Sequence, residues 1–421
     1  MQRCSPAAYR LGRGREIFVA RPRMIARRAA PLTLPAMSAL PSPKPSALRR
    51  ALGTLTRTAL LPVRGAALLY QSGRAHQHFF LPVLNGVFGD QLAARHDARA
   101  IQLSFRRGGH DVAVADLHLC EPRQKTVIFV HGLMGDELIW QTGFQDAPQG
   151  PLRYGPRLAQ EASVRVLYVR YNTGLHISEN GRALHLLLNE LIKAYPDALG
   201  ELVLVGHSMG GLVIRSAGYY AAQLRVMSYE LRVKKGGRVQ SKVENQLLTV
   251  NSQLLTDNWL AHLRSVFLLG VPHDGSYLEQ NGQLVERLLR RINLFPTRFV
   301  SEAIARRSNG IKDLGQALLV DEDWQQPDDP ALPRPRTVVP LLPGVRYHVL
   351  VGAWLKANLP QAVRDYFGDG LVGAASGRGE LFGDETNLPP GTSVRTARFG
   401  AQHHSGLLRH PEVYHYLRQW L

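Results

Sequence analysis

The chain has 421 residues, of which 45% are hydrophobic, and a formal net charge of +18. This length and apolar content are enough for one large globular domain or two, and they exclude a chain that is disordered throughout. The charge is unevenly placed, because residues 1–89 carry 14 basic side chains and one acidic side chain, and therefore +13 of the +18. Since the rest of the chain is only weakly basic, we expect no nucleic-acid partner.

The first 45 residues are rich in Arg, Ala, Pro and Ser, so a disordered basic tail is expected over residues 1–45. The same composition is typical of an organellar transit segment, and Met24 and Met37 are alternative start positions. No apolar run of about 7 to 15 residues follows the basic stretch, which argues against a secretory signal. No stretch approaches the roughly 20 apolar residues that cross a bilayer.

Residues 46–98 are expected to form an N-terminal helical segment. Within it, residues 48–70 mix Leu and Ala with Arg, which fits a helix packed on the domain or an amphipathic helix on an anionic membrane. The second alternative predicts peripheral membrane contact through the basic N-terminal region. Two cysteines, Cys4 and Cys120, do not make a disulfide framework and favour a reduced compartment. We therefore predict a cytoplasmic protein, with membrane association as an open alternative.

Residues 99–421 are expected to form an α/β domain. Alternating side chains flank a Gly-rich turn at 107–110, which predicts an antiparallel hairpin of strands 101–105 and 112–117. Apolar runs and stripes then predict strands at 126–130 and 164–169, a helix near 182–194, strands at 202–206, 266–269, 347–351 and 393–399, and a last helix at 411–421. This alternation predicts a mostly parallel central sheet with helices on both faces.

Two segments are longer than this alternation requires. Residues 223–262 are polar and basic, and residues 277–343 are helical in pattern and rich in proline. Insertions of this size in a compact domain are typical of lids and binding loops, with surface decoration as the alternative. We predict that 277–343, together with 223–262, forms a helical cap whose apolar residues, such as Leu288 and Phe295, contact an acyl chain.

The stretch Gly206-His207-Ser208-Met209-Gly210 follows an apolar run and precedes a second one. Strand, sharp turn and helix is the context in which the pattern G-x-S-x-G marks a nucleophilic serine. The flanking glycines are needed because a Cβ would clash where helix and strand cross closely. Ser208 is therefore the candidate nucleophile. Ser276 is a rival that lacks this setting.

A serine nucleophile needs a base to take its proton and a third group to orient the base. In this type of fold the partners follow in the order serine, acid, histidine. Asp369 begins an Asp-Gly turn beyond strand 347–351, where a carboxylate can point toward the serine. It is the candidate acid, and Asp274, Asp365 and Asp384 are alternatives.

The candidate base is His404, which follows the last predicted strand at 393–399. A histidine on a loop there reaches over the carboxyl edge of the sheet. His403 and His410 compete for this role.

Acyl transfer also needs N–H donors aimed at the developing oxyanion. One is expected to be the backbone N–H of Met209, directly after the nucleophile. The other is expected from the turn that begins at His131, where Gly132 allows close approach and Leu133 supplies the N–H. His131 and His207 are poor base candidates because both lie in turns that place the backbone.

These motifs resemble the α/β-hydrolase superfamily, in particular the bacterial lipase/esterase branch similar to triacylglycerol lipases and GPI inositol-deacylase-like hydrolases. The residues that carry the resemblance are His131-Gly132-Leu133, Gly206 to Gly211, Gly270-Val271-Pro272-His273-Asp274-Gly275-Ser276, Asp369-Gly370-Leu371-Val372 and His404. The resemblance implies the α/β-hydrolase fold with a cap or lid, and the roles of nucleophile, acid and base for Ser208, Asp369 and His404. It also implies Leu133 and Met209 as oxyanion donors.

The expected function is cleavage of carboxylic esters, including lipid esters, through an acyl-enzyme on Ser208. The alternatives are an acyltransferase with the same triad and a hydrolase-fold binding protein without chemistry. No metal-ligand spacing is present in the sequence, and the chemistry needs no cofactor, so we expect neither. Acyl length and the alcohol of the substrate do not follow from these residues.

Overall fold

The structure is a computed structural model, and it describes residues 77–141, 153–234, 258–273, 307–325, 336–353, 388–400 and 404–421. The predicted tail at 1–45 and the predicted amphipathic helix at 48–70 lie outside these residues. Within the predicted helical segment 46–98, the structure has helix α2 (Gln77–Ala94). Membrane contact through the N-terminal region therefore stays a prediction.

The centre of the molecule is a sheet of eight strands in the order β2-β1-β4-β3-β5-β6-β7-β8. The strands are β1 (Ser104–Arg107), β2 (His110–Val112), β3 (Gln124–Val130), β4 (Arg165–Arg170), β5 (Leu199–His207), β6 (Leu263–Leu269), β7 (Arg346–Ala353) and β8 (Ser393–Gly400). Only β1 pairs antiparallel with its neighbours, and all pairs from β4 to β8 are parallel. The mostly parallel sheet predicted from the sequence is confirmed.

The predicted hairpin is present, but its strands are shorter and shifted. Its turn contains Gly108 and Gly109, with φ of 58° and 83°, a conformation that glycine adopts without strain. The second strand ends at Val112, and Val114–Leu117 forms a 3-10 helix instead of continuing it. Both end residues of this helix are buried, because a spacing of three places them on the same side of a 3-10 turn.

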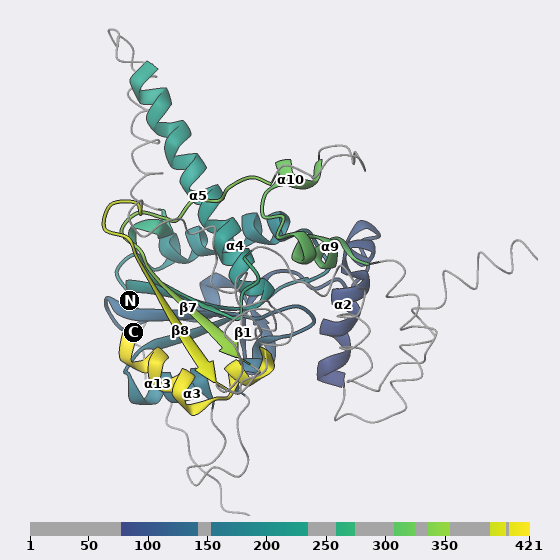
Figure 1. Cartoon of the computed structure of the whole chain (residues 1–421), viewed down its shortest axis with the longest axis horizontal. Helices are drawn as coiled ribbons and strands as arrows, with labels where there is room; N and C mark the ends of the chain where they lie inside the picture. Colours follow the sequence, from purple (N-terminus) through teal and green to yellow (C-terminus); the bar gives the residue numbers. More distant parts are fainter. Residues whose placement is uncertain are drawn as a thin grey trace, which may run out of the picture. The chain divides into compact units, whose positions relative to one another are not determined.

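Helices cover both faces of the sheet, as Figure 1 shows. Helices α4 (Ile177–Ala194) and α5 (Met209–Lys234) lie on one face, and α3 (Tyr154–Glu161) and α13 (Pro411–Trp420) lie on the other. Helix α4 begins five residues before the predicted start, where the Glu179 side chain accepts a hydrogen bond from the His176 N–H. Helix α5 continues to Lys234, so the first part of segment 223–262 is helical.

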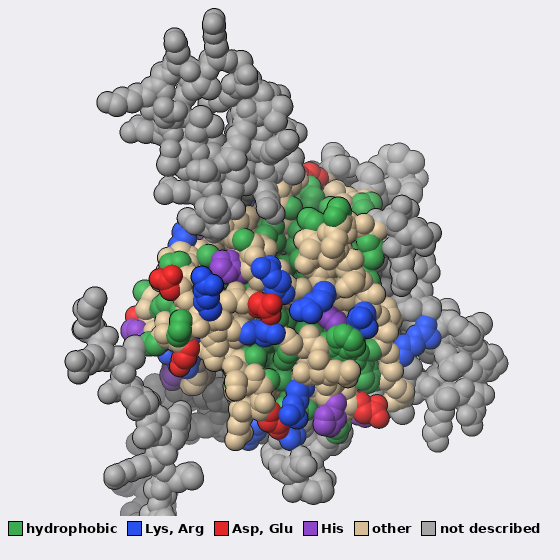
Figure 2. Space-filling view, turned by 90° about the vertical axis from the view of Figure 1, so that its left-hand side faces the viewer, with side chains coloured by type: hydrophobic (Ala, Val, Ile, Leu, Met, Phe, Trp, Pro, Cys, Tyr) green, Lys and Arg blue, Asp and Glu red, His purple; other side chains and the backbone are tan. Residues whose placement is uncertain are grey.

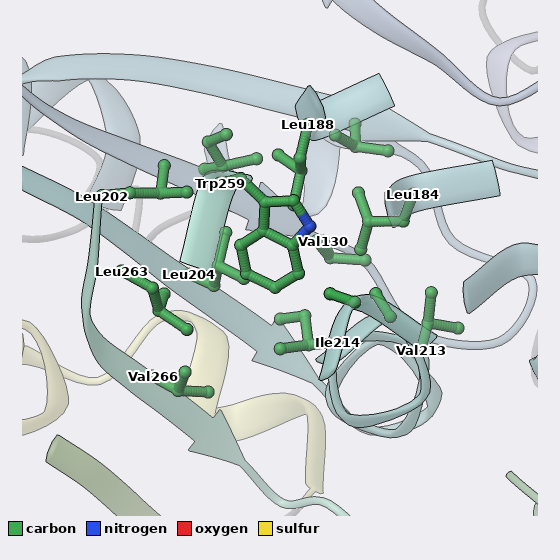
Figure 3. Close-up of a cluster of buried hydrophobic side chains, with 14 of the residues drawn as sticks. Val130, Leu184, Leu188, Leu202, Leu204, Val213, Ile214, Trp259, Leu263 and Val266 are labelled. Atoms are coloured by element: carbon green, nitrogen blue, oxygen red, sulfur yellow. The ribbon is translucent and has the colours of Figure 1, made fainter. Parts of the chain in front are cut away.

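Successive side chains of the central strand point to opposite faces and join two separate cores. On β5, Leu202 and Leu204 pack with the core under α4 and α5, whereas Val203 and Val205 pack with the core under α3 and α13. Figure 3 shows the first core, in which the indole of Trp259 lies among apolar side chains of the sheet and of both helices. This two-sided burial explains why the strands appear in the sequence as continuous apolar runs.

The described surface carries charges of both signs. Figure 2 shows basic and acidic side chains interspersed on the face that it presents, with apolar side chains between them. Among the described residues, no helix is long and apolar enough to span a membrane. The cytoplasmic location stays a prediction.

Buried histidines should make the fold sensitive to acid. His131 and His348 are almost fully buried, and burial lowers the pKa of each from 6.5 to about 4. Below about pH 6.5 the unfolded chain therefore binds protons that the folded chain does not. The contribution of each buried histidine to the free energy of unfolding is fully present above pH 6.5. It is lost as the pH falls toward 4, and the loss is on the order of 3 kcal/mol per histidine.

His348→Gln tests this linkage, because it removes one buried titratable ring from β7. Urea unfolding at pH 7.5, 6 and 5 should show a free energy of unfolding that falls less steeply with acid in the variant than in the parent. The test compares the slopes of the free energy of unfolding against pH. A lower stability of the variant at pH 7.5 therefore does not affect the result. Parallel slopes would show that His348 takes up its proton equally in the folded and unfolded states.

Candidate active site

Ser208 lies at the sharp turn between β5 and α5. Its φ of 52° is in the left-handed region, which is strained for a residue with a side chain. Its N–H donates a hydrogen bond to the carbonyl of Leu269 at 2.9 Å, which ties the turn to the neighbouring strand β6. Ser208 is 8% exposed and is therefore buried. This is the geometry of a nucleophile elbow.

The glycines around Ser208 are required by close backbone crossing, as the sequence predicts. A Cβ on Gly206 would lie 2.7 Å from the Cα of Gly211, at the point where strand β5 and helix α5 meet. A Cβ on Gly210 would overlap the carbonyl oxygens of Val130 and His131. Strand, turn and helix are therefore packed too tightly for any larger residue at either position.

The turn after β3 reaches Ser208 from the neighbouring strand. Val130 at the end of β3 pairs with Gly206 of β5, so both strands end at the same level of the sheet. A Cβ on Gly132 would lie 3.1 Å from the Cβ of Ser208 and 3.0 Å from Nδ1 of His207. The backbone that precedes Leu133 thus passes directly over the candidate nucleophile.

His131 holds this turn rather than acting on a proton. Its Nδ1–H donates to the carbonyl of Gly132 at 2.9 Å, and its Nε2 accepts a hydrogen bond from the N–H of Tyr171 at 3.3 Å. The Tyr171 hydroxyl donates to the carbonyl of His131 at 2.8 Å, and the two rings stack with their centroids 4.4 Å apart. Because the buried ring stays neutral, it provides fixed hydrogen bonds to the backbone.

The two candidate oxyanion donors belong to two chain segments that meet at Ser208. Met209 is the first residue of α5 and is fully buried. Leu133 follows Gly132 and is partly buried against two apolar clusters. The turn is closed by a hydrogen bond of 3.1 Å from the N–H of Gly135 to the carbonyl of Gly132. Backbone N–H groups fixed in this way need no reorganisation when charge develops.

His404 lies beside the residue that precedes the nucleophile. It begins the 3-10 helix η7 (His404–Leu408) after β8 and is 8% exposed. The Nε2–H of His207 donates to the carbonyl of His404 at 3.2 Å, and the two imidazole centroids are 4.6 Å apart. The structure therefore brings the candidate base to the loop that carries Ser208.

The competing histidines are placed differently. His410 directly precedes helix α13, and its carbonyl accepts a hydrogen bond from the hydroxyl of Tyr154 at 2.8 Å. His403 lies outside the described residues. Of these candidates, His404 is the one for which the structure shows contact with the turn that carries the nucleophile.

The candidate acid falls outside the described residues, and so do its alternatives. Asp369, Asp274, Asp365, Asp384 and the rival nucleophile Ser276 all belong to this group. Strands β7 and β8 are parallel and pair up to their last residues, so the chain leaves both at the same edge of the sheet. The segment that contains Asp369 follows β7, and its role as the acid stays a prediction.

Part of the predicted cap segment 277–343 packs on the body of the domain. Helix α9 (Asn309–Gln316) places the buried carboxylate of Asp313 2.9 Å from both Nδ1 of His176 and the N–H of Ile177, at the start of α4. The hydroxyl of Ser216 on α5 donates to the carbonyl of Leu319 at 2.7 Å. Leu288 and Phe295 lie outside the described residues, so a cap over Ser208 stays a proposal.

The sequence analysis did not identify Arg215, which contacts His273 in the turn after β6. The guanidinium of Arg215 lies 3.2 Å from Nδ1 of the fully buried His273 and donates to the carbonyl of Val339 at 3.0 Å. Burial and this positive charge lower the pKa of His273 well below its usual value. Arg215 is seven residues after Ser208 on α5, a helical spacing that would have suggested a shared face.

No three His, Cys, Asp or Glu side chains of the described ranges are grouped to hold a metal ion. The arrangement that these ranges do show is a strained serine, a loop of backbone N–H groups beside it and a histidine on the adjacent loop. On an eight-stranded, mostly parallel sheet, this combination defines an enzyme of the α/β-hydrolase type.

A family model described as the alpha/beta hydrolase family matches residues 127–414, which is more than half of the chain. The chain therefore belongs to the α/β-hydrolase family, as the sequence motifs predict. No curated protein matches the chain.

Solved structures to which the chain is similar include bacterial lipases. The Bacillus licheniformis lipase BlEst2 in its mature form is 15% identical, with a TM-score of 0.40, over 75% of this chain and 97% of that one. Lipase 1 from Pelosinus fermentans is 13% identical, with a TM-score of 0.39, over 71% and 98%. Phospholipase PlaB from Legionella pneumophila is 17% identical, with a TM-score of 0.32, over 60% and 45%.

Proposed function

We propose that the protein is a serine hydrolase that cleaves carboxylic esters, including lipid esters. The observation that carries the proposal is the position of Ser208, in a strained turn with Gly132 against one side. Such strain persists only where the surrounding structure enforces it, and it is common at catalytic sites. The loop of His404, next to His207, supports the same assignment.

In the proposed reaction, the Oγ of Ser208 attacks the ester carbonyl while His404 takes its proton. The carbonyl oxygen becomes an oxyanion, which accepts hydrogen bonds from the N–H groups of Leu133 and Met209. The C–O bond of the ester breaks, and His404 returns the proton to the departing alcohol. Water then attacks the acyl-enzyme, again through His404, and releases the acid and Ser208. Asp369 orients the imidazole and stabilises its charged form.

Two alternatives use the same fold. In an acyltransferase, an alcohol or thiol replaces water in the second step, so a new ester would accumulate when an acceptor is added. A binding protein without chemistry would not react with a fluorophosphonate probe. We expect covalent labelling by this probe and hydrolysis of a chromogenic short-chain ester to the free acid, with no new ester in the presence of glycerol. Absence of labelling and of turnover in the folded protein would contradict the proposed enzyme.

We also propose that segment 277–343 caps Ser208 and contacts the acyl chain. Replacing Leu288 with Gln should lower the turnover of long-chain chromogenic esters several-fold more than that of short-chain esters, because a polar group is then forced against the acyl chain. Leu319→Ala is the matched control, since Leu319 is buried against the body of the domain and should affect stability without changing chain-length preference. Equal losses on long and short esters in Leu288→Gln would remove the support for the cap.

A further inference from the structure

Helix α2 lies before residue 127, where the match to the hydrolase family begins, yet it packs against the turn that carries Leu133. Its buried side chains form one apolar cluster with Met134, the residue after the candidate oxyanion donor. The members from α2 are Val83, Leu84, Val87, Phe88 and Leu92. Leu133 itself packs against this cluster, so two consecutive residues of the turn take part in the apolar contacts that bury α2.

The closest approach is at Gly86. A Cβ on Gly86 would overlap Cγ of Met134 and would lie 3.3 Å from Oγ1 of Thr173. That same Oγ1 accepts a hydrogen bond from the N–H of Met134 at 3.2 Å. The backbone of α2 therefore packs closely against the Met134 side chain, next to the hydrogen bond that Met134 donates to Thr173.

Met134 is in a conformation that needs such support. Its φ is 56°, in the left-handed region that a residue with a long side chain rarely adopts. A residue in this conformation stays there only when its neighbours leave no alternative. The direction of the Leu133 N–H depends on the same short turn, which closes between Gly132 and Gly135.

Helix α2 is itself anchored firmly to the body of the domain. The hydroxyl of Ser308 donates to the carbonyl of Gly86 at 2.6 Å, and the amide of Asn172 donates to the carbonyl of Gly89 at 2.9 Å. Figure 1 shows the helix beside α9, which contains Ile311 of the same apolar cluster. The helix is thus a fixed support rather than a loosely attached extension.

We propose that α2 positions the oxyanion donor, with Gly86 and Met134 as positioning residues for catalysis. This proposal rests on the proposed function, because it assigns the role of donor to the Leu133 N–H. Contact of α2 with Met134 holds the strained turn, and the turn aims the N–H at the substrate carbonyl oxygen. The region before the matched hydrolase residues is then needed for catalytic rate, and not only for stability.

A double-mutant cycle on Gly86→Ala and Met134→Ala tests the coupling. Gly86→Ala should lower kcat for a short chromogenic ester about tenfold or more, with KM changed little, because misplacement of a catalytic group acts on the reacting state. Met134→Ala removes the side chain that the new methyl group would displace. In that background Gly86→Ala should have no further effect on kcat.

The control is Gly155→Ala on α3, where a Cβ would overlap the hydroxyl of Tyr168 in the core on the opposite face of the sheet. This variant should lose stability and keep kcat. If Gly86→Ala fails to fold, Val87→Ala takes its place in the cycle, since it truncates a fully buried α2 side chain of the same cluster and adds no bulk. Independent effects of the two substitutions on kcat, or an unchanged kcat in a folded Gly86→Ala variant, would overturn the proposal.

Hydrogen exchange separates this proposal from the proposed function. In Gly86→Ala, or in Val87→Ala as its substitute, the amides of residues 132–135 should exchange faster than in the parent, whereas Gly155→Ala should leave them unchanged. This measurement needs no ester turnover. Faster exchange in a protein without esterase activity would support the role of α2 and contradict the ester-hydrolase function, and unchanged exchange would contradict the role of α2 itself.

Discussion

Ser208→Ala should lower the rate of ester hydrolysis by at least about 10³-fold and abolish labelling by a fluorophosphonate probe. The change removes only the Oγ, and the backbone hydrogen bond from the Ser208 N–H to Leu269 remains available. The melting temperature should therefore stay close to that of the parent. Rates of hydrolysis, extent of labelling and thermal unfolding can be measured on the same preparation.

Ser276→Ala is the matched control, because Ser276 is the rival nucleophile from the motif after β6. It should keep both hydrolysis and labelling. Residual activity of Ser208→Ala within tenfold of the parent, with the protein folded, would contradict the assignment of Ser208. Loss of labelling in Ser276→Ala would transfer the assignment to that residue.

Asp369→Asn should lower kcat by about 10³- to 10⁴-fold, because the amide holds the imidazole in the wrong tautomer and cannot stabilise its positive charge. The same substitution at Asp274, Asp365 and Asp384 provides three controls of equal chemistry. Each of these three should keep most of its activity. A large loss at one of them, with Asp369→Asn near the parent value, would identify that residue as the acid.

The sequence alone predicted the inner strands β3, β5 and β6, because each is a mostly apolar run that is buried on both faces of the sheet. The run at 202–206 corresponds to β5, and the run at 347–351 corresponds to β7. The ends of elements were less predictable. The helix expected from residue 182 begins at Ile177, because its first turn is stabilised by a hydrogen bond between Glu179 and His176 rather than by apolar spacing.

The second strand of the hairpin was predicted too long for a related reason. Val114 and Leu117 continue an apolar pattern, but they bury their side chains from a 3-10 turn. A pattern of burial does not distinguish these two geometries over four residues.

The local motif of the nucleophile needed no tertiary information. Gly206 and Gly210 flank Ser208 because the backbones of the strand, the turn and the helix are in contact there. This requirement affects residues that are adjacent in the sequence, so a local motif reveals it. The order of the motifs also predicted that Gly132 and His404 approach the same turn, although they are 76 residues before and 196 residues after Ser208. Parallel strands bring their carboxyl ends to one edge of the sheet, so both segments leave the sheet on the side where Ser208 lies.

Only the tertiary structure decided what supports this edge. Arg215 beside His273, Asp313 beside His176, and Gly86 of α2 against Met134 join residues whose sequence distances follow no pattern. The sequence by itself determined the class of fold, the candidate nucleophile and the order of its partners, because these depend on local spacing and strand order. The contacts that hold the catalytic turn depend on which distant surfaces meet in the folded chain, and no periodicity encodes them.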